Sequence, residues 1–302
     1  MPKAETALIA IAYRHFMAVA ETGSVRAASR DLNIAASAIS RQIIQLEETL
    51  GLALFDRSGR GLTLTPAGMV LLRGLRDTAQ GHENTLDELA ALRGLKRGLL
   101  RIATVESISV SILPDMLLAF AKAYPGIEVA VTVAGSDAVT TLVRDHEADA
   151  GFTFNPSSLK GLSVAAARDL HLGAVMAPTH PLAREKRLNL ADCAAYPLAW
   201  PSRGLSLRAV LEAVPAARKL RPAFECNSLR LMASLARRGS CIAFQTPIGI
   251  EQELKDGALI WIPLTDKRLP ADGLKVVCRA NAGARPAVEA FLALAARHLP
   301  AN

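Results

Sequence analysis

Residues 24–60 read SVRAASRDLNIAASAISRQIIQLEETLGLALFDRSGR and give the clearest indication of how the chain folds. Ser24 is a residue type that caps helices, and the sequence after it predicts a short helix over residues 25–32. Asn33 comes next, and Asn accepts the left-handed backbone of a tight turn more readily than most residues. We therefore expect one helix, a turn at Asn33, and a second helix directly after it.

The second helix, around residues 36–49, has two faces of different chemistry. Its apolar stripe is spaced by four, three and four residues, as a packed helix face requires: Ile39, Ile43, Leu46 and Leu50. Its other face presents donors and acceptors of the right length for a DNA groove: Ser37, Ser40, Arg41 and Gln45. The stripe and the turn alone also fit a generic three-helix domain whose polar face is only solvated.

The segment after Gly51 has the composition of a small basic hairpin, or wing. Leu54 and Phe55 would anchor it by burial. Arginines in the wing and in the first helix of the pair would hold DNA phosphates: Arg26, Arg30, Arg57 and Arg60. The pattern therefore favours double-stranded DNA as a partner.

The whole stretch closely resembles the N-terminal winged helix-turn-helix of LysR-type transcriptional regulators. The resemblance extends over both helices, the wing and the start of the next helix, at positions that include Phe16, Val19, Gly23, Ser24, Ala27, Ala28, Leu32, Ser37, Ser40, Arg41, Gln42, Ile43, Leu46, Glu47, Gly51, Phe55, Arg57, Thr65 and Gly68. That family typically has Ser-Gln where this chain has Ala35 and Ala36, and the Gln usually helps to read a base edge. The departure leaves the operator sequence of this chain open.

Length and charge agree with this interpretation. A chain of 302 residues fits two or three domains, and a net charge of +7 suits a polyanionic partner. Residues 1–66 hold seven Lys or Arg against six Asp or Glu, so the placement of the cations matters more than their total.

No signal peptide or membrane-spanning run is visible, so we expect a cytoplasmic protein with no membrane partner. The four cysteines are scattered without a CxxC pair, and buried thiols are expected, with a redox-sensing pair as the alternative: Cys193, Cys226, Cys241 and Cys278. The six histidines show no metal-ligand spacing. Neither a metal nor a resident cofactor is therefore expected.

A long helix is predicted from Thr65-Pro66 to about residue 95. It carries a heptad-like seam, as a contact between two helices requires: Leu72, Leu75, Ala79, His82, Leu86 and Leu89. His82 is expected to be a partly exposed seam residue, with a pH switch as the alternative. In the LysR family this element is the linker helix that pairs two subunits, which implies a dimer and, for the family, usually a homotetramer.

From residue 99 onward, short apolar strands alternate with helices, which predicts α/β architecture with parallel pairing. This part resembles the two-lobed effector domain of the same family, which is like periplasmic solute-binding proteins, at Leu113-Pro114, Gly135-Ser136, Ala148–Gly151 and His180–Leu182. The expected domains are a DNA-binding domain (1–66), a linker helix and hinge (67–98) and an effector domain (99–302). Within the last, the first lobe would be 99–161 plus 267–302, and the second 162–266.

A small-molecule effector is expected beyond the carboxyl ends of the strands, where helix N-termini also gather. The candidate contacts there are Ser107, Ser109, Ser136, Ser202, Arg203, Asn227 and Thr246. Ser and Asn are also ordinary helix caps, which is the plainer explanation for them. Glu106 is unusual beside an anion site, and either points away or indicates an effector with an amine.

The sequence contains no GxSxG, HExxH, P-loop or dinucleotide-binding motif, so an enzyme is not expected. The resulting prediction is a sequence-specific LysR-type regulator that binds DNA, is modulated by an effector and acts on RNA polymerase. The alternative is a small-molecule binding protein whose helix-turn-helix has lost operator recognition.

Overall fold

The computed structural model describes residues 2–59, 61–92, 98–239, 241–280 and 285–299. The chain divides into two compact units, residues 1–83 and residues 84–302. The long helix α4 (Pro66–Leu92) begins in the first unit and ends in the second.

The first unit is a helix-turn-helix with a two-stranded wing. Its elements are α1 (Pro2–Thr22), α2 (Val25–Leu32), α3 (Ala36–Leu50), β1 (Phe55–Gly59) and β2 (Gly61–Leu64), followed by α4. The expected helix over residues 25–32 is confirmed, and the Ser24 side chain accepts a hydrogen bond from the Ala27 N–H at 3.4 Å. Asn33 has a φ of 54°, the left-handed turn conformation that its residue type predicts.

The core of the first unit lies where α1, α3 and the wing meet. Phe16 is fully buried and its ring lies 5.3 Å from that of Phe55 at the start of β1. Glu47 fixes the wing to the end of α3, because its carboxylate accepts hydrogen bonds from the backbone N–H groups of Leu54 and Phe55 at 2.7 and 3.2 Å. Gly68 permits α4 to start against this turn, since a Cβ there would meet the Leu54 carbonyl at 2.2 Å.

The expected seam on α4 is divided between two environments. Leu72 is buried in the core of the first unit, and Leu75 packs against that core. Ala79 and His82 are exposed, while the side chains of Leu86 and Leu89 lie outside the described residues. The first two seam positions therefore stabilise their own unit.

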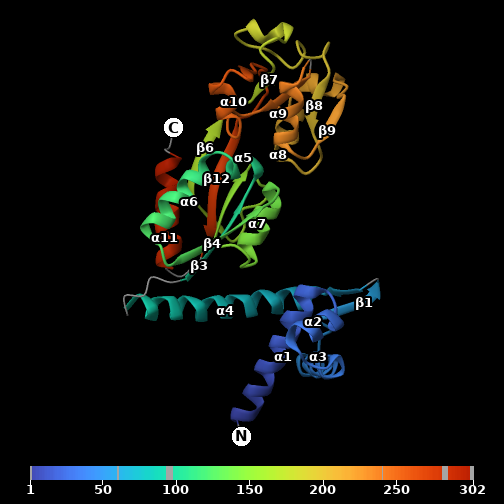
Figure 1. The fold of residues 1–302 in the computed structure, drawn as a ribbon. Coiled ribbons are helices and arrows are strands. Elements are labelled where there is room, and N and C mark those ends of the chain that lie inside the picture. Colours follow the sequence, from blue (N-terminus) through green and yellow to red (C-terminus); the bar gives the residue numbers. More distant parts are fainter. Residues whose placement is uncertain (1, 60, 93–97, 240, 281–284, 300–302) are drawn as a thin grey trace. The chain divides into compact units, whose positions relative to one another are not determined.

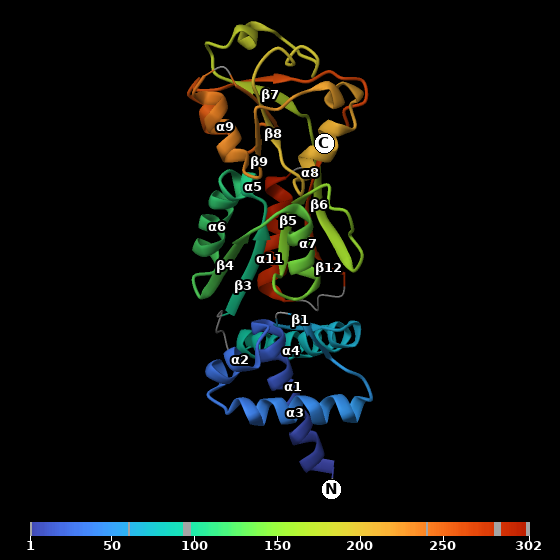
Figure 2. The same ribbon diagram turned by 90° about the vertical axis from the view of Figure 1, so that its right-hand side faces the viewer.

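The second unit has two lobes, each built on a five-stranded sheet (Figures 1 and 2). The first sheet has the order β4-β3-β5-β12-β6, with bounds β3 (Gly98–Thr104), β4 (Ile127–Val133), β5 (Ala150–Phe154), β6 (Leu162–Leu170) and β12 (Asp272–Arg279). Its helices are α5 (Glu106–Ser109), α6 (Ile112–Ala123), α7 (Ser136–Arg144) and α11 (Pro286–His298). Helices α6 and α11 cover one face of this sheet and α7 covers the other (Figure 1).

The second sheet has the order β11-β7-β10-β8-β9. Its strands are β7 (Gly173–Met176), β8 (Leu198–Pro201), β9 (Phe224–Cys226), β10 (Ile242–Gln245) and β11 (Ile260–Pro263). Its helices are α8 (Ser206–Glu212), α9 (Leu229–Arg237) and α10 (Glu251–Lys255), with 3-10 helices η1 (Pro181–Arg184) and η2 (Pro215–Lys219). Residues 190–195, between η1 and β8, form a series of turns.

The sheets are mixed rather than purely parallel. In the first sheet β3 pairs in parallel with β4 and β5, as the alternation of strands and helices predicts, whereas β12 runs antiparallel to β5 and β6. The expected lobe boundary at residue 162 is wrong for residues 162–170, because β6 pairs with β12 from Leu170↔Asp272 to Leu162↔Arg279. The chain then crosses between the lobes twice, after β6 and before β12.

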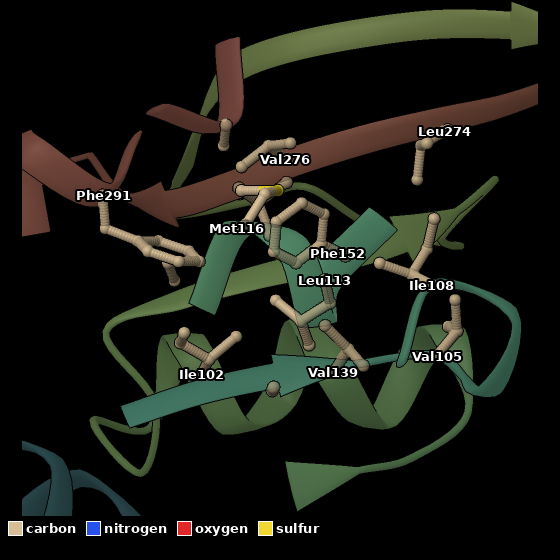
Figure 3. Close-up of a cluster of buried hydrophobic side chains, with 14 of the residues drawn as sticks. Ile102, Val105, Ile108, Leu113, Met116, Val139, Phe152, Leu274, Val276 and Phe291 are labelled. Carbon is tan, nitrogen blue, oxygen red and sulfur yellow. The ribbon is translucent and has the colours of Figure 1, made fainter. Parts of the chain in front are cut away.

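Each lobe has its own apolar core. In the first lobe Ile102, Phe152 and Phe291 are at most 1% exposed, and the rings of Phe152 and Phe291 meet edge to face at 6.2 Å (Figure 3). At the rim of this core, Arg285 and Asp149 form a buried ion pair at 2.6 Å. Because Asp149 also accepts from the Arg101 N–H, both of its oxygens have partners.

Candidate functional site

Helix α3 has a buried face and a polar outer face, as its sequence predicts. Ile39, Ile43 and Leu46 are at most 4% exposed, and all three belong to the core of the first unit. On the outer face Ser37, Arg41 and Gln45 are exposed and Ser40 is half-buried. The Arg41 Nε donates to the Ser37 carbonyl at 3.3 Å, which leaves the rest of the guanidinium on the surface of α3.

The other basic residues expected at this surface are described in part. Arg26 and Arg30 are exposed on α2. Arg57 lies in β1, but its side chain lies outside the described residues, as does the whole of Arg60. The structure therefore groups exposed arginines on α2 and α3.

The start of α3 shows the physical effect of the unusual Ala35. This residue occupies the N-cap position and is exposed, and no side chain caps the helix. Ser, Thr, Asp or Asn at an N-cap stabilises a helix by about 1 kcal/mol relative to Ala. The first N–H groups of α3 thus lack the partner that the commoner serine would supply, and such groups bind phosphate well.

A cavity of about 280 Å³ lies between the two lobes of the second unit. Four of the seven expected effector contacts line it: Ser107, Ser136, Asn227 and Thr246. The other three, Ser109, Ser202 and Arg203, are absent from the described lining, and Arg203 is exposed. Apolar walls come from both lobes and include Val105, Phe154 and Leu207.

Ser107 and Ser136 are fixed at the lobe junction. Ser107 is 4% exposed, and a Cβ on Gly249 of the second lobe would approach its side chain to 3.1 Å. Ser136, at the start of α7, accepts from the Phe154 N–H at 3.3 Å and donates to the Ser206 hydroxyl of the second lobe at 3.4 Å. Both hydroxyls therefore lie on a surface that is shared by the lobes.

Glu106 forms hydrogen bonds with the second lobe, and these bonds account for an acidic residue at this position. Its carboxylate accepts from the Ser228 hydroxyl at 2.9 Å and from the N–H groups of Leu229 and Arg230 at 2.7 and 3.3 Å. A residue of α5 thereby caps α9 across the lobe junction, and Figures 1 and 2 place these helices side by side.

The expected contacts did not include four polar residues that line the cavity: Ser206, Ser228, Gln245 and Asp272. Gln245 is 2% exposed and its Oε1 has no hydrogen-bond partner within the described part of the chain. Asp272 is 6% exposed and accepts from the Asn155 side-chain amide at 2.9 Å. Burial raises the pKa of Asp272 to about 7, against a smaller effect of Lys275 in the opposite direction.

The structure also bears on the cysteine thiols, on metal binding and on membrane-spanning helices. Burial raises the pKa of every cysteine thiol, that of Cys193 to about 12, so the thiols are protonated at neutral pH. In the described part of the chain, no three His, Cys, Asp or Glu side chains lie close enough together to hold a metal ion. None of the described helices combines the length and the apolarity that crossing a bilayer requires.

Comparison with known proteins identifies both units. Residues 12–69 match the family described as bacterial regulatory helix-turn-helix protein, lysR family, and residues 93–300 match the LysR substrate binding domain. The chain is 27% identical to the HTH-type transcriptional activator CmpR of Synechocystis, over 65% of this chain and 64% of CmpR, slightly less than two thirds of that relative. It is 28% identical to the HTH-type transcriptional regulator CbbR of Sinorhizobium medicae, over 94% and 92% of the two chains.

A solved structure has the same fold along nearly the whole chain. A full-length variant of OxyR from Pseudomonas aeruginosa superimposes with a TM-score of 0.72 over 94% of this chain and 93% of that one, at 16% identity. The likeness therefore includes the helix-turn-helix and both lobes.

Proposed function

Because the chain belongs to the family of LysR-type bacterial transcriptional regulators, we propose that the outer face of α3 reads operator DNA and that the cavity between the lobes takes the effector. Regulators of this type bind DNA through the helix-turn-helix and respond to a small molecule in the second domain. The observation that carries the proposal is the polar outer face of α3 opposite the buried side chains of Ile39, Ile43 and Leu46.

In this proposal α3 enters the major groove, with Ser37, Ser40, Arg41 and Gln45 at or near base edges. Arg26, Arg30, Arg57 and Arg60 hold the phosphate backbone on either side. The uncapped start of α3 at Ala35 offers N–H groups to a further phosphate. Two such units on a dimer would reach major grooves about one helical turn apart.

A gel-shift titration tests the DNA-binding face. The DNA just upstream of the protein's own gene is compared with scrambled DNA at one fixed salt concentration, because phosphate contacts alone produce affinity. Arg41→Ala is expected to weaken specific binding by about tenfold to a hundredfold. The matched control is Arg14→Ala, which removes the same charge from an exposed position on α1. Equal losses in the two variants would remove Arg41 from the readout.

The same titration tests the alternative function, a binding protein without operator recognition. Equal affinity for the upstream and the scrambled DNA, with and without a pool of metabolites, would favour that alternative. A preference for the upstream DNA supports the regulator and provides the assay for effectors.

For the effector we propose a small molecule that contacts Ser107, Ser136, Asn227 and Thr246, which line one cavity. We keep Ser109, Ser202 and Arg203 as peripheral candidates that would require a different lobe arrangement. The domains are proposed as 1–66, 67–98 and 99–302, with residues 162–170 assigned to the first lobe.

Self-association through α4 is part of the proposal. Met69 and Val70 are large apolar side chains that are 51% and 66% exposed on this helix, and a second copy of α4 would cover them. Val70→Asp is expected to lower the subunit number in light scattering, whereas Thr78→Asp, at another exposed α4 position, is the control. An unchanged subunit number for Val70→Asp would exclude this face.

We further propose that two dimers form a tetramer, that the DNA-bound protein contacts RNA polymerase in the cytoplasm, and that the chain acts by binding and not as an enzyme. Membership of the LysR family supports these proposals.

A further inference from the structure

The charges that line the cavity have one sign. Among the described lining residues two are acids, Glu106 and Asp272, and none is Lys, Arg or His. Glu106 already accepts three hydrogen bonds at the start of α9. It therefore both neutralises that positive helix end and occupies the N–H groups that an anion would need there.

Asp272 is the second acid, and no cation lines the cavity beside it in the described part of the chain. The Asn155 amide donates to its carboxylate, and the Asn155 Oδ1 accepts from the Gly273 N–H at 3.1 Å, so the amide is held with its NH₂ group toward the carboxylate. Lys275 acts on Asp272 only from a distance and does not offset the effect of burial. A buried carboxyl in this state is stabilised by any cation that reaches it.

Gln245 supplies a second acceptor in the lining of the same cavity. The Trp261 indole donates to its backbone carbonyl at 3.0 Å, which fixes the residue, while among the described residues the side-chain Oε1 stays unpartnered. Gln245 is paired with Gly173 in the second sheet, and Asp272 is paired with Leu170 in the first. Because residues 170 and 173 bound one short crossover, each acceptor is paired with a residue at one end of that crossover, and both line the cavity.

We infer that the effector carries an ammonium group that donates to the Asp272 carboxylate and to Gln245 Oε1, while its body lies against the apolar walls. The inference rests on the proposed function of this cavity and names the chemical class of its ligand. A volume of about 280 Å³ suits a small metabolite, which leaves an aliphatic amine or an amino acid. Such a ligand makes a charge-assisted hydrogen bond to a carboxylate that is only 6% exposed.

Calorimetric titration of the full-length protein with three probes of equal length tests this inference: n-pentylamine, n-pentanoate and 1-pentanol. Pentylamine is expected to bind at least about tenfold more tightly than pentanoate, with measurable binding below about 10 mM. The amino acid norvaline is a fourth probe, and its affinity relative to pentylamine separates the two ligand sources.

Two aspartate variants test whether the preference for pentylamine depends on Asp272. Asp272→Asn keeps the shape of the side chain and is expected to remove the preference for pentylamine. Asp169→Asn removes the same charge from an exposed β6 position whose partner is Gly273, one residue from Asp272, and is expected to keep the preference. Gln245→Leu is expected to weaken pentylamine binding by a smaller factor.

Three results would overturn the inference: tighter binding of pentanoate, no binding of either ammonium probe, or an undiminished preference in Asp272→Asn. None of these would remove the cavity as the effector site. The proposed function is tested by a separate measurement, the change in operator binding when a metabolite pool is added. Ser136→Leu fills the cavity and should abolish that change. The proposed function fails if the change is the same in Ser136→Leu as in the unmodified protein.

Discussion

The two units present their polar side chains in opposite ways. In the first unit Ser37, Arg41 and Gln45 point outward from one helix. In the second unit Gln245 and Asp272 point inward, and each is at most 6% exposed. A duplex is larger than the unit that reads it, so its contacts must stand on a convex surface. A small molecule must be surrounded, so its contacts must come from several segments.

This difference also determines what holds each site together. The polar face of α3 depends on a single helix, whose buried stripe belongs to one core. The cavity depends on two cores and on the hydrogen bonds that cross between the lobes from Glu106 and Ser136. Changes to the first site should therefore be local, whereas changes to the second should also alter the relation of the lobes.

The largest expected effects on stability come from truncating a large buried side chain in the core of each unit. Phe16→Ala in the first unit and Phe291→Ala in the second should each lower the free energy of unfolding by about 3–5 kcal/mol, since both side chains are fully buried. In scanning calorimetry, each variant should lower the transition of its own unit. If either variant lowered both transitions equally, the units would not be independent.

A smaller effect is the dependence of stability on pH, which should have opposite signs in the two units. Asp272 has a pKa raised to about 7 by burial, so the folded state holds a proton that the unfolded state releases near pH 4. The stability of the second unit should therefore fall as pH rises from about 4 to 7, by on the order of 1–3 kcal/mol. Asp272→Asn should remove this dependence.

In the first unit the corresponding group is His15, which is 4% exposed and whose Nδ1 has no hydrogen-bond partner among the described residues. Burial, and to a lesser extent Arg14, lower the pKa of His15. The unfolded state then takes up the proton more readily, so the stability of this unit should fall as pH drops below about 6.5. His15→Gln should flatten that loss, and urea titrations at pH 5.5 and 7.5 would measure both slopes. If the stability of both units changed with pH in the same direction, the expected contrast between the units would be contradicted.

The smallest effect concerns the bond between the lobes. Glu106→Gln keeps the side-chain shape but removes the charge at the start of α9, and should destabilise the second unit by about 1 kcal/mol. Glu128→Gln, at an exposed position on the edge strand β4, is the matched control. Equal melting temperatures for the two variants in thermal unfolding would show that the cap contributes nothing.

The degree to which the sequence predicts each site follows from the same contrast. A helix periodicity of four and three residues is a local signal, and it correctly predicted the burial of Ile39, Ile43 and Leu46, whereas Leu50 at the end of the expected stripe is 40% exposed. The residue type of Asn33 correctly predicted the turn. Ser107, Ser136, Asn227 and Thr246 were expected at the cavity because they follow strands or begin helices, a rule that needs only strand order.

That rule did not predict Asp272 and Gln245, for physical reasons. Asp272 begins a strand rather than following one, and it reaches the cavity because β12 runs antiparallel to its neighbour β5. Gln245 is the last residue of a buried strand, where a sequence gives no sign of a polar group facing a cavity. The assignment of residues 162–170 to the wrong lobe has the same origin, since strand direction is a property of the assembled sheet.

The surroundings of Gln245 have a consequence for spectroscopy. The sequence contains two tryptophans, and both lie beside the end of β10: Trp261 donates to the Gln245 carbonyl, and Trp200 meets Phe244 edge to face at 5.4 Å. The DNA-binding unit has no indole at all. The intrinsic fluorescence of this protein therefore reports on the second lobe alone, at and beside the strand that ends in Gln245, which allows ligand binding to be followed without a label while the protein is bound to DNA.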